Sequence, residues 1–112
     1  MSRPFKKTWN LLEAVELCRQ IEEFCPDYGY HVALTGGSLY KDGERKDADI
    51  LFYTIRQRED QNNQGLMEHL ESIGLQILYG SQFGEAWVAK GKYFGKDVDL
   101  FFPEIVKGEY HG

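Results

Sequence analysis

The chain has 112 residues, of which 42% are apolar and 14% aromatic, so it has the size and composition of one folded domain rather than of a disordered segment. Its formal charge of −5 differs from the basic surplus that nucleic-acid-binding domains carry, which disfavours a nucleic-acid partner. The sequence shows no apolar stretch long enough to span a membrane and no signal peptide. We therefore expect a cytoplasmic protein without a membrane partner, with residues 1–112 in a single domain and loose tails at 1–7 and 104–112.

The N-terminal part predicts a helix and then a strand. Apolar residues recur at helical spacing, and they are Leu11, Leu12, Val15, Cys18 and Ile21. We expect a helix over about 8–24, with Thr8 as its N-cap and Pro26 just beyond its end. Cys18 and Cys25 match no zinc-site spacing and are expected to be free thiols that pack as small apolar groups. A β-rich run over 30–35 predicts the first strand.

The centre of the chain turns sharply between two apolar runs. Residues 36–38 read Gly-Gly-Ser, and such a turn exposes backbone N–H groups that suit anions. A charged loop follows. The chain then enters a second expected strand over 47–55, whose continuous apolar middle predicts burial on both faces.

The C-terminal half predicts one helix and three strands. Asn62 or Asn63 is the expected cap of a helix that ends at Gly74. Strands are expected over 75–79, 83–90 and 96–102, with a turn at 80–82 between the first two. Trp87 and Tyr93 could stack on a base, although packing habit favours the core for both.

Aspartates two residues apart begin two of the expected strands. Asp47 and Asp49 point to the same side, since side chains alternate along a strand, and so do Asp97 and Asp99. Like charges held this close repel each other, and a divalent cation such as Mg²⁺ removes that conflict. Between the later two, we favour Asp99 over Asp97 because Asp99 lies within the apolar part of its strand, where an unpaired charge is costly.

The motif TGGSLY, followed by KDADI and a later acidic strand, resembles the polymerase-beta-type nucleotidyltransferases. It is most similar to the small, stand-alone minimal nucleotidyltransferases, and the resemblance covers roughly residues 30–102. It implies an α/β (α+β) fold, with a mixed β-sheet and helices mainly on one face. It also implies Mg²⁺ or Mn²⁺ held by the catalytic residues Asp47, Asp49 and Asp99.

The resemblance further implies a nucleoside triphosphate as substrate. Gly36, Gly37 and Ser38 would contact its phosphates, and Arg45 and Lys46 would offset its charge, although both could equally be solvated loop residues. The expected reaction transfers a nucleoside monophosphate, most simply AMP, to a hydroxyl of a protein or small molecule. A helical partner protein is expected by analogy with toxin–antitoxin pairs. The alternative is an inactive binding module of the same fold, completed by a partner chain, because no C-terminal domain follows the last acidic strand.

Overall fold

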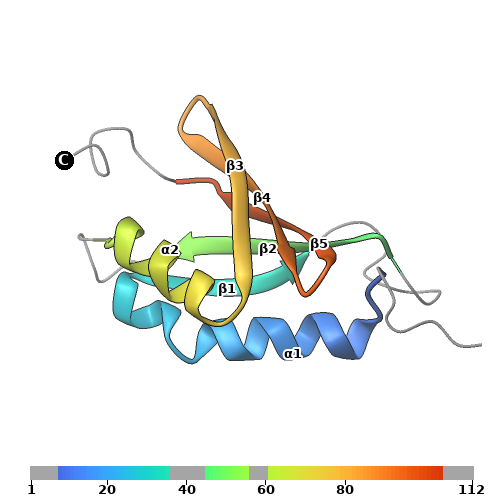
Figure 1. The fold of residues 1–112 in the computed structure, drawn as a ribbon. Coiled ribbons are helices and arrows are strands. Elements are labelled where there is room, and N and C mark those ends of the chain that lie inside the picture. Colours follow the sequence, from blue (N-terminus) through green and yellow to red (C-terminus); the bar gives the residue numbers. More distant parts are fainter. Residues whose placement is uncertain (1–7, 36–44, 56–60, 105–112) are drawn as a thin grey trace, which may run out of the picture.

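The computed structural model describes residues 8–35, 45–55 and 61–104, which form a mixed β-sheet with two α-helices (Figure 1). The elements in chain order are α1 (Leu11–Glu22), the short 3₁₀ helix η1 (Cys25–Tyr28), β1 (Tyr30–Thr35), β2 (Asp47–Thr54), α2 (Asn63–Ser72), β3 (Leu75–Phe83), β4 (Ala86–Tyr93) and β5 (Lys96–Phe102). The expected tail at 1–7 lies outside the described residues, and so do residues 105–112 of the expected tail at 104–112. Glu104, placed in the second tail, accepts a hydrogen bond from the Thr54 hydroxyl at 2.5 Å.

The five strands lie in the order β1-β2-β5-β4-β3. Only β2 and β5 pair in parallel, and the other three neighbouring pairs are antiparallel. The sheet is therefore mixed, as predicted. The chain crosses from β2 to β5 through α2 and the β3–β4 hairpin, so two segments about 50 residues apart in sequence become direct neighbours in the sheet.

Both helices pack on one face of the sheet, where the core lies. Alternate residues of β2 and β5 are buried there, with Phe52 and Phe102 stacked at a ring-centroid distance of 4.5 Å. The helices contribute Leu17, Ile21, Leu66 and Leu70 to the same cluster. The predicted burial of β2 on both faces is wrong: Leu51 is half-buried and Tyr53 is 41% exposed, because neither α1 nor α2 covers the second face.

Side-chain caps fix where the helices begin. Asn10, rather than the expected Thr8, caps α1: its side chain accepts from the Glu13 N–H at 2.8 Å and the Glu13 carboxylate accepts from the Asn10 N–H at 3.0 Å. Asn62 caps α2 by accepting from the Gly65 N–H. Neither described helix, of 12 and 10 residues, has the length and apolar character needed to cross a membrane.

The β3–β4 hairpin is longer than predicted and extends beyond the helical layer (Figure 1). The expected turn at 80–82 lies inside β3, and the chain turns at Gly84, whose φ of +63° favours glycine. Gly80 serves packing instead, since a Cβ there would lie 2.2 Å from the Trp87 ring. Gly80 therefore marks a position where an aromatic ring approaches the strand backbone closely, and it does not mark the end of the strand.

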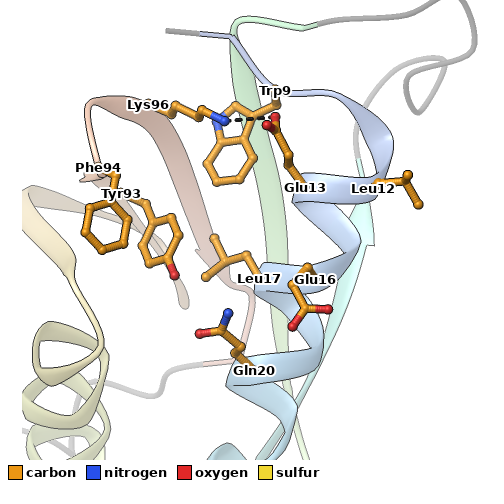
Figure 2. Close-up of a pocket in the computed structure, with 9 residues that line it drawn as sticks. All are labelled: Trp9, Leu12, Glu13, Glu16, Leu17, Gln20, Tyr93, Phe94 and Lys96. Atoms are coloured by element: carbon orange, nitrogen blue, oxygen red, sulfur yellow. Dashed lines mark ion pairs between the residues drawn. The ribbon is translucent and has the colours of Figure 1, made fainter. Parts of the chain in front are cut away.

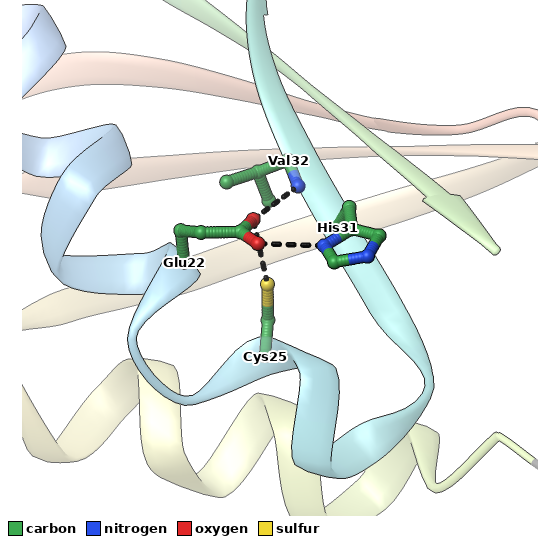
Figure 3. A network of polar contacts seen from close by, with 4 residues as sticks. All are labelled: Glu22, Cys25, His31 and Val32. Carbon is green, nitrogen blue, oxygen red and sulfur yellow. Dashed lines mark hydrogen bonds and ion pairs between the residues drawn. The ribbon is translucent and has the colours of Figure 1, made fainter. Parts of the chain in front are cut away.

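Glu22 holds the edge strand β1 against the end of α1 (Figure 3). Its carboxylate accepts from the Val32 N–H at 3.0 Å, lies 2.6 Å from His31 Nδ1 and accepts from the Cys25 thiol at 3.7 Å. Burial raises the pKa of the Cys18 thiol to about 11 and also raises that of Cys25. Both cysteines are free thiols, as predicted.

Candidate functional site

The four strand-entry aspartates meet on the sheet face that the helices leave open. Parallel pairing of β2 with β5 places Asp47 opposite Asp97 and Asp49 opposite Asp99. Their chain neighbours Ala48 and Val98 are buried among the core side chains, so the aspartates point the other way. Neighbouring strands are about 4.8 Å apart, which brings the carboxylates within strong electrostatic reach.

Two lysines of β4 face the aspartates of β5. Lys90 lies opposite Asp99 and its Nζ is 2.8 Å from Oδ1 of that carboxylate, while Lys92 Nζ is 2.5 Å from Oδ1 of Asp97. The two aspartates differ in exposure, because the Asp99 side chain is 13% exposed and that of Asp97 is 44% exposed. Asp99 is thus the enclosed member of the pair, as its position in the apolar strand indicated.

Asp49 carries the clearest electrostatic conflict. Partial burial, the charge of Asp99 and a hydrogen bond with the Asp99 carboxyl raise the pKa of Asp49 to about 6, against a smaller opposing effect of Arg45. Asp47 adds a further, smaller increase to the pKa of Asp49. The three aspartates predicted to act together are therefore electrostatically coupled.

Trp9 anchors the entry to both acidic strands. Its backbone exchanges two hydrogen bonds with Arg45, of 2.7 and 2.8 Å, and its indole N–H donates to the Asp97 carbonyl at 2.7 Å. This bridge keeps Arg45 near the site, where its charge lowers the pKa of Asp49. Lys46 is exposed beside Asp47. The other predicted phosphate contacts, Gly36, Gly37 and Ser38, lie outside the described residues.

A cavity of about 280 Å³ is lined by Lys90, Lys92 and three of the four aspartates, which are Asp47, Asp97 and Asp99, while Asp49 is not among its lining residues. Leu78 and Tyr79 of β3 and Gly91 of β4 complete its lining. Sequence reasoning missed Tyr79 because a β-bulge between Ile77 and Tyr79 shifts the strand register, and strict alternation cannot locate such a shift. The two aromatic residues considered for base stacking lie on the core face instead: Trp87 contacts Phe102, and Tyr93 stacks on Trp9.

A second cavity of about 370 Å³ lies between α1 and the β4–β5 turn (Figure 2). Its lining is mainly apolar, with Trp9 and Leu17 at the interior and Phe94 at the rim. The main charges there are matched, because Lys96 Nζ is 2.8 Å from a Glu13 carboxylate oxygen and 5.1 Å from the centre of the Trp9 ring. The second carboxylate that lines this cavity, Glu16, pairs with Arg19, so both acidic side chains there already have a cationic partner.

The oxygen-rich donor set fits a divalent cation in its chemistry. Within the described ranges, no group of three or more His, Cys, Asp or Glu side chains is arranged to hold a metal ion. Asp49 and Asp99 lie directly opposite each other on β2 and β5, and Lys90 Nζ is 2.8 Å from one oxygen of Asp99. A hard cation would offset the repulsion between these two carboxylates and compete with the ammonium group of Lys90 for the oxygens of Asp99.

Comparison of the chain with protein-family models and with curated proteins finds no match. The case for a function therefore rests on the sequence motif and on the geometry of the acidic face.

Proposed function

We propose that this protein is a metal-dependent nucleotidyltransferase that moves a nucleoside monophosphate, most simply AMP, from a nucleoside triphosphate to a hydroxyl of a protein or small molecule. One observation carries the proposal: the parallel register of β2 and β5 pairs Asp49 with Asp99 on the open face, with Asp47 two residues before Asp49. A cation is the simplest ligand that would remove the resulting conflict. The resemblance of the surrounding motif to nucleotidyltransferases supports the same reading.

Asp47, Asp49 and Asp99 would hold Mg²⁺ or Mn²⁺, which when bound supplies positive charge to the α-phosphate and the leaving group. The acceptor hydroxyl oxygen forms a bond to the α-phosphorus, and the bond from that phosphorus to the β-phosphate oxygen breaks. Pyrophosphate leaves with its electron pair. Asp99 accepts the hydroxyl proton, and Lys90, released from Asp99, neutralises charge on the phosphates.

Thermal unfolding with Mg²⁺ and each of the four nucleoside triphosphates tests the site. A ligand at a hundredfold its dissociation constant stabilises the native state by about 2.7 kcal/mol, which gives a readable shift in melting temperature. We expect a magnesium-dependent shift in the wild type, its loss in Asp99→Asn, and its retention in Glu16→Gln. Glu16 is the matched control because it is an exposed carboxylate on α1 that pairs with Arg19. A wild type that no triphosphate stabilises contradicts the proposal.

The second candidate is a non-catalytic module of the same fold, possessing a nucleotide site that a partner chain completes. The contact between Lys90 and Asp99 favours it, because a lysine already compensates the carboxylate that catalysis would use. Pyrophosphate release from the stabilising triphosphate, measured with hydroxyl-bearing proteins and small alcohols as acceptors, separates the candidates. Nucleotide binding without release in any of these mixtures favours the module.

A further inference from the structure

One row of side chains crosses the open face from edge to edge. Direct cross-strand pairs join Thr35 to Asp49, Asp49 to Asp99, Asp99 to Lys90 and Lys90 to Tyr79. Side chains of directly opposed residues lie on the same face of a sheet. The row therefore passes from the last residue before the predicted phosphate-binding turn, through the carboxylates and an ammonium group, to an aromatic ring.

We propose that the Tyr79 ring is the surface on which the nucleobase of the triphosphate stacks. The proposal rests on the proposed function and adds to it the part of the site that binds the base. The described residues of the motifs TGGSLY and KDADI, which are Thr35 and residues 46–50, include no aromatic ring that could stack on a base. Tyr79 would consequently determine how strongly the site distinguishes a nucleotide from a bare polyphosphate.

The position of Tyr79 supports this role. The side chain is 59% exposed, yet it lines the same cavity as Lys90 and Asp99. The β-bulge places it there, since an uninterrupted register after the Ile77–Gly91 pair would set Leu78 opposite Lys90. An irregularity in the strand thus brings an aromatic ring, in place of an aliphatic side chain, beside the phosphate-neutralising lysine.

The spacing also suits a nucleotide. Tyr79 lies two strands from Asp99, which is roughly 10 Å at the usual distance between neighbouring strands. A nucleoside monophosphate unit laid along the row would reach from a metal-bound α-phosphate at Asp99 to a base on Tyr79. Because every base has a π-face, stacking of this kind favours nucleotides in general over any one base.

Binding measurements with two probes test the role of Tyr79. Isothermal titration compares MgATP with magnesium tripolyphosphate, which has the phosphates but no base. We expect Tyr79→Ala and Tyr79→Leu to weaken MgATP binding about tenfold and to leave tripolyphosphate binding unchanged, while Tyr79→Phe remains near the wild type. Phe83→Ala is the matched control, because Phe83 is a 64% exposed aromatic residue of the same strand that does not line the cavity.

The outcomes separate this inference from the proposed function. A wild type that binds neither probe overturns both. A wild type that binds MgATP through Asp99, with unchanged affinity in Tyr79→Ala, overturns the stacking role alone. Equal loss of both probes in Tyr79→Ala, or an equal loss of MgATP binding in Phe83→Ala, also overturns it. The melting temperature of each unliganded variant establishes that the fold is intact.

Discussion

Glu22 and the Asp49–Asp99 pair are carboxylate clusters in opposite electrostatic situations. The groups around Glu22 are donors: a backbone N–H, a histidine ring and a thiol converge on its two oxygens (Figure 3). Asp49 instead faces another carboxylate and is pushed toward its protonated form. The contrast shows that this fold can supply hydrogen-bond donors to both oxygens of a carboxylate that joins a helix to a strand, as Glu22 does.

The four strand-entry aspartates still repel one another even though the same sheet places lysines beside them. Lys90 and Lys92 pair with Asp99 and Asp97, yet four carboxylates share the region with these two ammonium groups. Arg45 lowers the pKa of Asp49 without overcoming the effects that raise it. Such an arrangement costs stability, and a ligand that carries positive charge would recover it.

The largest expected change in stability follows from removing the Glu22 carboxylate, which accepts hydrogen bonds from several donors. Glu22→Ala leaves the Val32 N–H of an edge strand without its acceptor and removes the partner of His31, so we expect a loss of about 2 kcal/mol in the free energy of unfolding. Urea denaturation measures it. The control Glu16→Ala, which breaks an exposed pair with Arg19, should change stability by less than about 0.5 kcal/mol. Equal effects of the two substitutions would contradict the structural role of Glu22.

Removing the Asp49 carboxylate should instead raise the free energy of unfolding. A folded-state pKa of Asp49 raised from 3.8 to about 6 means that its contribution to stability is full below about pH 4 and is lost as the pH rises to about 6. This corresponds to at most about 3 kcal/mol, which we reduce to about 1 kcal/mol because water screens the half-exposed carboxyl. Asp49→Asn should therefore stabilise the protein by about 1 kcal/mol at pH 7.5 and by little at pH 4.

Urea denaturation at the two pH values checks this prediction. Asp97→Asn is the control, since Asp97 is more exposed and pairs with Lys92, and it should show no comparable gain at pH 7.5. If Asp49→Asn shifts stability equally at both pH values, the raised pKa of Asp49 is not the cause.

The smallest expected effect distinguishes the two lysines that pair with the aspartates of β5. Lys90→Met removes the cation nearest Asp99, so the uncompensated charge of Asp99 should raise the pKa of Asp49 further, with a stability change of only a few tenths of a kcal/mol. Carbon-13 NMR titration of the aspartate carboxyls measures it. Lys92→Met, which frees Asp97 instead, should leave the titration of Asp49 nearly unchanged, and indistinguishable curves for the two variants would refute the assignment.

Much of the fold could be predicted from local patterns. Helical spacing located α1 and α2, and the apolar runs located five strands, because these signals depend on residues close together in the chain. Errors arose where tertiary contacts decided the outcome. Gly80 reads as a turn residue, yet the Trp87 ring lies against it inside a strand. The apolar middle of β2 reads as buried on both faces, yet the helices cover only one.

The sequence by itself determined which aspartates could share a face, because alternation along a strand is a local property of Asp47, Asp49, Asp97 and Asp99. Only the tertiary structure decided that the two pairs are neighbours, through the parallel pairing of β2 with β5. It also decided, through burial, that Asp99 is the enclosed member, and it brought Lys90 and Tyr79 into the same row through antiparallel pairing and a bulge. Strand order and register depend on contacts between distant segments, and no local pattern in the chain encodes them.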